Sequence, residues 1–297
     1  MKVSLGSWAF SFGPYATRPV PFDAVAKRLS EAGYDGIEVC GFPPHVTPEA
    51  YQAPESRKRL VRHLEDLRLP ISGYAADFST VNPIVSGNKQ RYLDLLKRNL
   101  DLCAAIGSPS IRVDTGAAPG AVLEEDYDSS LGRLADIWHE AAGIGGECGV
   151  KLLWEFEPGF VFNKPTEISE LHAKVHHPNF QILFDTAHAY MCAVACARQH
   201  GEPERLEGGV AELLRKLVGR IGHVHLVDSD GTLYGEETST HCLLGEGRLD
   251  FWALAPRLRA IPGAEWWCVD LCFHPDAWSL IDSSLAYVKR LLAASAQ

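Results

Sequence analysis

Short apolar runs alternate with longer amphipathic stretches along the whole chain. The apolar runs predict eight strands, at residues 3–8, 36–41, 71–76, 110–114, 151–157, 181–185, 221–227 and 266–271. Most of these runs carry apolar side chains at successive positions, which is typical of strands that are covered on both faces. Strands that alternate with helices in this way predict a parallel sheet.

The stretches between the strands carry helix-ending signals and amphipathic spacing. We expect helices at residues 21–33, 55–67 and 124–148, one that ends at Gly107 after a loop at 77–88, and a short one from Thr166. Residues 187–219 are expected to be helical with a polar break near Gly201. A further helix begins at Asp250, and a last one ends near Ala294. The longest irregular loop is expected at residues 228–248.

Eight strand–helix units favour closure into a barrel over an open sheet. The predicted fold class is α/β, a (β/α)8 TIM barrel, and about 250 residues is the usual size of this fold. The chain has 297 residues, so we predict one domain over residues 1–297. A doubly wound open sheet is the alternative, but no Gly-x-Gly-x-x-Gly fingerprint follows the first strand.

The composition of the chain limits the molecules that it can bind and where it is expected to act. The net charge is −10 and there is no cluster of Lys and Arg, so we expect a small neutral substrate and no nucleic acid. No apolar run reaches the roughly 18 residues of a membrane span, and no signal peptide is evident. The eight cysteines form no disulfide framework, so we expect reduced thiols and a cytoplasmic protein.

Four acid or imidazole side chains end four successive predicted strands. They are Glu155, Asp185, His225 and Asp270. Because the carboxyl ends of the strands of a closed parallel barrel meet at one mouth, these side chains should converge there. Three carboxylates and one imidazole suit Mn²⁺, Mg²⁺ or Co²⁺ better than a Cys-rich zinc site does, although His188 and His241 could add nitrogen donors for Zn²⁺.

Other polar residues near these strand ends are further candidates. His188 follows Asp185 by three residues and should point into the mouth, although Asp185 could simply cap the next helix. Glu157 alternates with Glu155, and Pro158 and Gly159 follow it at once. We therefore expect Glu157 in the loop after the strand, in contact with substrate; the alternative is a structural ion pair. His223 alternates with His225 in the same way, and we prefer the more C-terminal His225 as ligand.

Further substrate contacts are expected around the mouth. His241 lies in the 228–248 loop before Gly245, where it is either the tip of a loop that closes over substrate or an ordinary surface histidine. The remaining candidates are Trp8, Glu38, Asp77, Arg112 and Asp114. Trp8 offers an apolar wall for the C–H face of a sugar, whereas the charged residues bind substrate oxygens or form internal ion pairs.

With these motifs the chain resembles the xylose isomerase-like TIM barrel superfamily, and within it the sugar phosphate isomerase/epimerase group. The resemblance covers nearly the whole length, and its landmarks are residues 36–39, 153–159, 184–188, 223–228, and His241 with 245–247. It implies a metal held by Glu155, Asp185, His225 and Asp270, with Asp270 where the family usually has Glu. It also implies that Glu155 and Asp270 move protons, and that the protein assembles as a homodimer or homotetramer.

The chemistry and the resemblance together predict an enzyme. We expect a divalent-metal-dependent isomerase or epimerase, with Mn²⁺ as the first choice, that converts a small keto-sugar or keto-polyol through a metal-stabilised enediolate. Glu155, Glu157 and Asp270 are the expected catalytic residues. The alternative is a lyase that uses the same enolate, either a dehydratase or an enzyme that cleaves 3-keto-glycosides. An endonuclease IV-like enzyme and a non-catalytic sugar-binding barrel are weaker alternatives, and phosphate recognition is not expected because Arg248 is the only cation close by.

Overall fold

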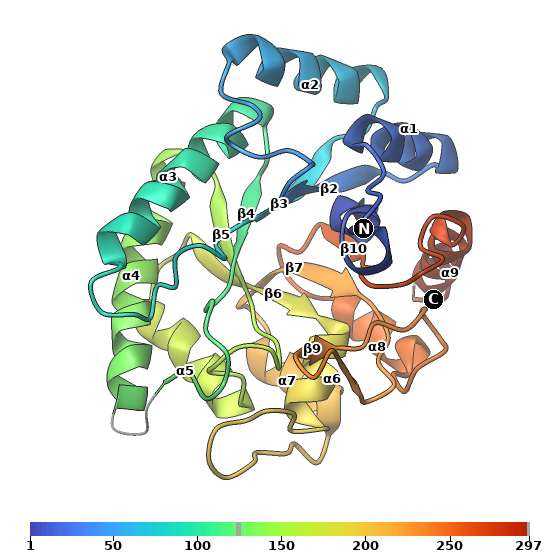
Figure 1. Ribbon diagram of the computed structural model, residues 1–297. Coiled ribbons are helices and arrows are strands. Elements are labelled where there is room, and N and C mark those ends of the chain that lie inside the picture. Colours follow the sequence, from blue (N-terminus) through green and yellow to red (C-terminus); the bar gives the residue numbers. More distant parts are fainter. Residues whose placement is uncertain (123–125, 296–297) are drawn as a thin grey trace.

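The computed structural model describes residues 1–122 and 126–295, and Figure 1 shows a closed barrel of parallel strands surrounded by helices. The strands pair around the barrel in the order β1-β10-β7-β6-β5-β4-β3-β2, so that the first strand meets the last. The barrel strands are β1 (Lys2–Gly6), β2 (Gly36–Gly41), β3 (Ile71–Ala76), β4 (Ser110–Val113), β5 (Lys151–Glu155), β6 (Phe180–Asp185), β7 (Ile221–Leu226) and β10 (Trp266–Val269). The predicted (β/α)8 barrel is therefore confirmed.

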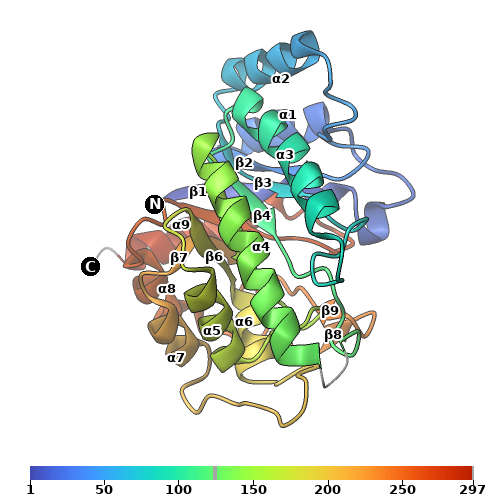
Figure 2. The ribbon, with the colours of Figure 1, turned by 90° about the vertical axis from the view of Figure 1, so that its left-hand side faces the viewer.

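The helices form an outer layer, and Figure 2 shows α4 crossing the side of the barrel. They are α1 (Phe22–Ala32), α2 (Pro54–Asp66), α3 (Lys89–Ile106), α4 (Tyr127–Glu147), α5 (Pro165–Val175), α6 (Thr186–Ala193), α7 (Gly209–Leu217), α8 (Phe251–Arg259) and α9 (Ile281–Ala294). Their apolar faces explain why they pack on the sheet: α7 buries Val210, Leu213, Leu214 and Leu217 at helical spacing. Within the described residues, no helix combines the length and apolar character that crossing a membrane requires.

Two strand ends differ from the sequence-based expectation. The first strand ends at Gly6, and Trp8 lies in a 3-10 helix, η1 (Ser7–Phe10). The fifth strand ends at Glu155 rather than at residue 157, and Glu157 lies in the loop that follows, as expected. The polar break expected near Gly201 is confirmed, because it separates α6 from α7. The expected start of the fourth helix near residue 124 lies outside the described residues.

The long 228–248 loop is more ordered than expected. It contains a small antiparallel pair, β8 (Leu233–Tyr234) and β9 (Thr238–Ser239). The buried carboxylate of Asp228 accepts backbone hydrogen bonds from Ser229, Gly245, Gly247 and Leu249, at 2.8 to 3.0 Å. This clamp explains the Gly-x-Gly sequence, because a Cβ on Gly247 would collide with the Asp228 carboxylate.

Polar side chains also occupy the barrel interior. The Ser72 hydroxyl on β3 donates to that of Ser4 on β1, although β2 lies between these strands. Glu38 on β2 contacts two histidines of β7, and two further strands, β1 and β10, separate β2 from β7. These contacts must cross the inside of the barrel, where branched apolar residues usually dominate. The polar interior leads directly to the site at the mouth.

Candidate metal and substrate site

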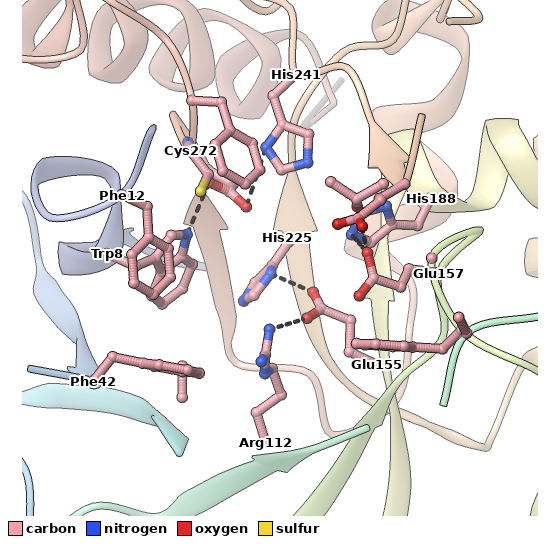
Figure 3. A pocket seen from close by; sticks show the side chains of 18 of the residues that line it. Trp8, Phe12, Phe42, Arg112, Glu155, Glu157, His188, His225, His241 and Cys272 are labelled. Atoms are coloured by element: carbon pink, nitrogen blue, oxygen red, sulfur yellow. Dashed lines mark hydrogen bonds and ion pairs between the residues drawn. The ribbon is translucent and has the colours of Figure 1, made fainter. Parts of the chain in front are cut away.

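A cavity of about 330 Å³ opens at the carboxyl ends of the strands, as Figure 3 shows. Ligands of barrel enzymes bind at this end of the fold. Eight of the residues predicted from the sequence line it: Trp8, Arg112, Glu155, Glu157, His188, His225, His241 and Asp270. The structure thus gathers most of the predicted side chains at one place, while their individual roles stay predictions.

Glu155, Asp185 and His225 form a compact cluster beside this cavity. One donor atom from each residue lies within 4.8 Å of the other two, and all three side chains are buried. The Nδ1 atom of His225 is 2.9 Å from a carboxylate oxygen of Glu155 and 3.9 Å from Oδ2 of Asp185. Two oxygens and one nitrogen at such distances form a donor set that can hold a divalent cation.

Asp185 gives the strongest sign that this cluster suits a cation. Its Oδ1 accepts a hydrogen bond from the backbone N–H of His188 at 2.8 Å and so caps α6. Its Oδ2 is buried and has no hydrogen-bond partner. Burial raises the pKa of Asp185 to about 7, and the nearby Glu155 carboxylate adds to the rise. Because an unpaired buried carboxylate oxygen is costly, a metal ion bound there would satisfy it.

Asp270 reaches the cavity from β10 and is held by other partners. Its Oδ1 accepts hydrogen bonds from the Trp8 indole N–H at 2.9 Å and from the Cys272 backbone N–H at 2.7 Å. Its Oδ2 is 3.5 Å from Nδ1 of His241. Burial would raise the pKa of Asp270, but His241 lowers it, so the carboxyl is ionised with one oxygen directed at His241. Burial would likewise lower the pKa of His241, but Asp270 raises it to about 9.

Beneath His225, the carboxylate of Glu38 bridges two imidazoles. Its Oε2 lies 2.7 Å from Nε2 of His223 and 3.1 Å from Nε2 of His225, and all three residues are buried. Burial would lower the pKa of His225, but Glu38 and Glu155 raise it well above its usual range. Glu38 therefore orients His225 so that Nδ1 faces the cluster, as carboxylates commonly do for metal-binding histidines.

Arg112 supports the cluster from the β4 side. Its guanidinium donates to Oε2 of Glu155 at 2.7 Å and to Oδ2 of Asp114 at 3.2 Å. Burial would raise the pKa of Glu155, but Arg112 and His225 lower it well below its usual range. Glu155 is thus an ionised carboxylate held in a fixed orientation by two cationic groups.

Glu157 and His188 form a second polar pair at the cavity wall. A Glu157 oxygen lies 3.7 Å from Nε2 of His188 and accepts a hydrogen bond from the Thr238 hydroxyl. Nδ1 of His188 is 2.8 Å from the Ser239 hydroxyl, so the β8–β9 segment covers both residues. Burial raises the pKa of Glu157 to about 7 and lowers that of His188 to about 3. Close to neutral pH, the Glu157 carboxyl can therefore both give up and take up a proton, while the His188 imidazole stays neutral.

Three predicted substrate-binding residues lie outside the cavity lining. Glu38 is beneath His225, and Asp114 is behind Arg112, to which it is paired. The carboxylate of Asp77 accepts hydrogen bonds from the backbone and hydroxyl of Ser79, so it organises its own turn. In each case a neighbouring cation or donor takes up the charge, which favours internal pairing, the alternative to substrate contact for these residues.

Sequence reasoning missed the aromatic part of the cavity. Phe12, Phe42, Phe160 and Phe273 line it, and so do Thr238 and Arg198. The first two phenylalanines follow β1 and β2, so the rule that strand ends build the site would have found them. An apolar residue after a strand is usually part of the core, so its position alone does not mark a phenylalanine as a site residue.

Known proteins resemble this chain in both sequence and structure. The family model for the xylose isomerase-like TIM barrel matches residues 26–291. Fructoselysine 3-epimerase of Escherichia coli O157:H7 is 26% identical over 242 residues, which cover 77% of this chain and 78% of that protein. Inosose dehydratase of Geobacillus kaustophilus is 36% identical over 104 residues, or 34% of this chain and 28% of that protein.

A solved structure extends this likeness over the full barrel. The IolI protein, crystallised with a zinc atom, has a TM-score of 0.72 at 17% identity, and the match covers 99% of this chain and 98% of that one. The two related sequences belong to enzymes, one an epimerase and one a dehydratase. From its barrel, its strand-end residues and the match over most of its length, the chain belongs to the xylose isomerase-like TIM barrel family.

Proposed function

We propose that this chain is a divalent-metal-dependent epimerase or isomerase that acts on a small keto-sugar or keto-polyol. The observation that carries the proposal is the cluster of Glu155, Asp185 and His225 beside the cavity, with an unpaired buried oxygen on Asp185. The similarity to fructoselysine 3-epimerase supports the reaction class. A small sugar is therefore the proposed binding partner, and nucleic acid is not.

In this proposal Glu155, Asp185 and His225 hold the metal, and Asp270 is the fourth ligand. The bound ion supplies a positive charge that polarises a carbonyl oxygen and makes the adjacent C–H bond more acidic. The carboxylate-rich donor set favours Mn²⁺, with Mg²⁺, Co²⁺ or Zn²⁺ as alternatives. The zinc atom in the related IolI structure supports a divalent ion but not a particular element.

Proton transfer is assigned to the two carboxylates that reach the cavity from different sides. Glu155 ends β5 and Asp270 follows β10, and β6 and β7 separate these strands in the barrel. Glu155 takes the proton from the substrate carbon. The protonated His241 beside Asp270 supplies a proton through that carboxylate to the opposite face of the carbon, which inverts the configuration. Positioned acids and bases of this kind contribute roughly 10²–10⁴-fold to the rate.

A second candidate function is dehydration or another elimination, which begins with the same proton removal. The similarity to an inosose dehydratase favours it, and so does the position of Glu157. Glu157 and His188 lie together at the wall, where Glu157 can donate a proton to a departing hydroxyl or glycosyl oxygen. The products distinguish the two: elimination releases water or an alcohol, whereas epimerisation keeps the formula of the substrate.

The test is solvent-isotope exchange. The protein is stripped of metal, reloaded with Mn²⁺, and incubated in D₂O with ketoses, inososes and 3-keto-glycosides, and the substrate C–H signals are followed by NMR. We expect metal-dependent deuterium uptake at the carbon next to the carbonyl, which Asp270→Asn slows and the exposed α5 variant Glu170→Gln leaves unchanged. No exchange with any of these compounds in the metal-loaded protein would refute the proposal.

Assembly as a homodimer or homotetramer is a separate proposal, supported only by the resemblance to the family. Light scattering coupled to size-exclusion chromatography gives the mass directly. One chain has a mass of 32.6 kDa, so a particle of that mass at micromolar concentration would contradict it.

A further inference from the structure

The cavity has two chemically different sides, and Figure 3 shows them facing each other. Arg112, Glu155, Glu157 and His188 come from β4, β5 and the segment after β6, which are neighbours in the barrel. The opposite side comes from the segments that follow β1, β2 and β10, which are also neighbours. The aromatic side, as we name it, consists of Trp8, Phe12, Phe42 and Phe273.

The rings of the aromatic side are held in place by contacts of their own. Phe12 and Phe42 pack edge to face, with centroids 5.1 Å apart and an interplanar angle of 86°. Phe273 stacks on Tyr234 at 4.3 Å and 13°. Trp8 is fixed by its hydrogen bond to Asp270. The aromatic side is therefore preorganised, so a ligand that packs on it loses little free energy to ordering the site.

Three of these four rings are also partly exposed to solvent. Phe12, Phe42 and Phe273 are only partly buried, whereas most aromatic side chains of the barrel are buried. Adjacent apolar rings left open to solvent around a cavity are a common mark of a binding surface. A ligand in the cavity would cover these rings.

The hydrogen-bonding groups of the aromatic side indicate which kind of ligand would fit there. The Trp8 indole N–H and the Cys272 backbone N–H both donate to Asp270, so neither is free for a ligand. A sugar hydroxyl placed against the phenylalanine rings would lose its hydrogen bonds to water without replacement, which is unfavourable. A sugar can pack one C–H face on Trp8, but its hydroxyl-bearing edge does not match three phenylalanine rings. A flat apolar group does.

Charge excludes an ionic substituent at this place. Among the described residues that line the cavity, Arg112 and Arg198 carry the guanidinium groups. Arg112 is paired with Glu155 and Asp114, and Arg198 donates to the backbone carbonyl of Glu237. Neither guanidinium belongs to the aromatic side. The His241 ring, which lies beside Phe273, faces the Asp270 carboxylate, so a phosphate or carboxylate there would lack an unpaired counterion.

We propose that the substrate is a keto-glycoside with a neutral aromatic aglycone. The aglycone packs on Phe12, Phe42 and Phe273, while the sugar ring lies on the opposite side of the cavity, against Glu155 and Glu157. Only the sugar half of this inference rests on the proposed function. It makes the enzyme selective for the substituent as well as for the reacting carbon. A free monosaccharide would fill only the polar half of the cavity.

The test compares ligands that cannot react. Phenyl, cyclohexyl and methyl β-D-glucopyranosides have a hydroxyl where a keto-glycoside has its carbonyl, so they are not consumed during a titration of the intact protein. Aromatic pairs contribute binding free energy beyond that of the area that they bury. We therefore expect the phenyl glucoside to bind about tenfold more tightly than the methyl glucoside, with the cyclohexyl glucoside between them.

Variants assign this preference to the aromatic side. Phe42→Leu and Phe12→Leu keep an apolar side chain and should each reduce the phenyl-to-methyl preference about threefold. Trp252→Ala, at an exposed position on α8 outside the cavity, should leave it unchanged. Thermal unfolding checks that each variant is folded, and the wild-type ratio needs no variant at all.

Equal affinities of the phenyl and methyl glucosides, or no binding of either at millimolar concentration, would overturn the inference. So would a preference that the two leucine variants leave intact. Isotope exchange with free ketoses is measured separately. A protein that exchanges deuterium but shows no aryl preference keeps the proposed function and loses this inference, whereas an aryl preference without any exchange does the reverse.

Discussion

Replacement of Glu38 by Gln tests how the barrel interior prepares the metal cluster. Oε2 of Glu38 accepts from Nε2 of both His223 and His225, at 2.7 and 3.1 Å. A Gln carbonyl can still accept, but it is neutral, and hydrogen bonds to an ionised acceptor are roughly twice as strong. Loss of such an outer partner typically weakens metal binding about 10–100-fold. We expect a decrease of this size in the affinity for Mn²⁺.

The choice of Gln over Ala follows from the burial of this network. Glu38→Ala would leave two buried imidazole N–H groups without an acceptor, at a cost of about 1–3 kcal/mol each. The free energy of unfolding would then fall by about 2–6 kcal/mol, and weaker metal binding could reflect a disordered core. Glu38→Gln keeps the volume and one acceptor oxygen, so it separates the orientation of His225 from the stability of the barrel.

The assay is calorimetric titration of the metal-stripped protein with Mn²⁺, and nitrogen-15 NMR of the histidines reports which ring nitrogen of His225 carries the proton. Asp77→Asn is the matched control, because it removes a carboxylate near the mouth that does not contact His225. The reasoning is refuted if Glu38→Gln binds Mn²⁺ within twofold of wild type, or if the protonation pattern of His225 does not change.

Three further predictions concern other parts of the molecule. Asp185→Asn keeps a helix-capping side chain but removes the charge of a proposed metal ligand. The affinity for Mn²⁺ in the same titration should fall by more than the ~100-fold expected when a residue that only contacts a ligand is replaced. The unfolding temperature should stay the same or rise. Burial lowers the pKa of His172 to about 4 from 6.5, so at this residue the unfolded chain binds more protons between these values. The slope of stability in urea against pH should therefore be less positive in His172→Phe than in the wild type across this window. Gly247→Ala should lower the free energy of unfolding by about 1–3 kcal/mol, because its Cβ meets Asp228. Gly132→Ala, in open space on α4, should raise it by up to ~1 kcal/mol. Equal effects of the two substitutions in urea unfolding would contradict the clamp.

The barrel was predictable because its signal is local. The apolar period, the Gly after α1 and the alternation of strand and helix all act over fewer than about 20 residues, which is the range that sequence patterns report. Closure then follows from the number of units. Consecutive strands of a closed barrel must end at one mouth, so the sequence also predicts that Glu155, Asp185 and His225 lie near one another, as they do.

The ends of the strands and the contacts between distant residues were less predictable from the sequence. A strand ends where its ladder of hydrogen bonds ends, and for β1 this happens at Gly6 because the chain turns into η1. The glycines before Arg248 were expected to make a flexible loop. Their amides in fact meet the Asp228 carboxylate, about 20 residues away along the chain, and no local pattern records this contact.

The sequence by itself determined the alternating elements, the closed barrel and which acids and histidines end its strands. Only the tertiary structure decided that Glu38 lies beneath His225, that Asp270 is held by Trp8, and that phenylalanines from the segments after β1, β2 and β10 form one aromatic side. The reason is physical. Periodicity fixes the face to which a side chain points, whereas its partner across the barrel comes from a strand many residues away, and packing alone selects it.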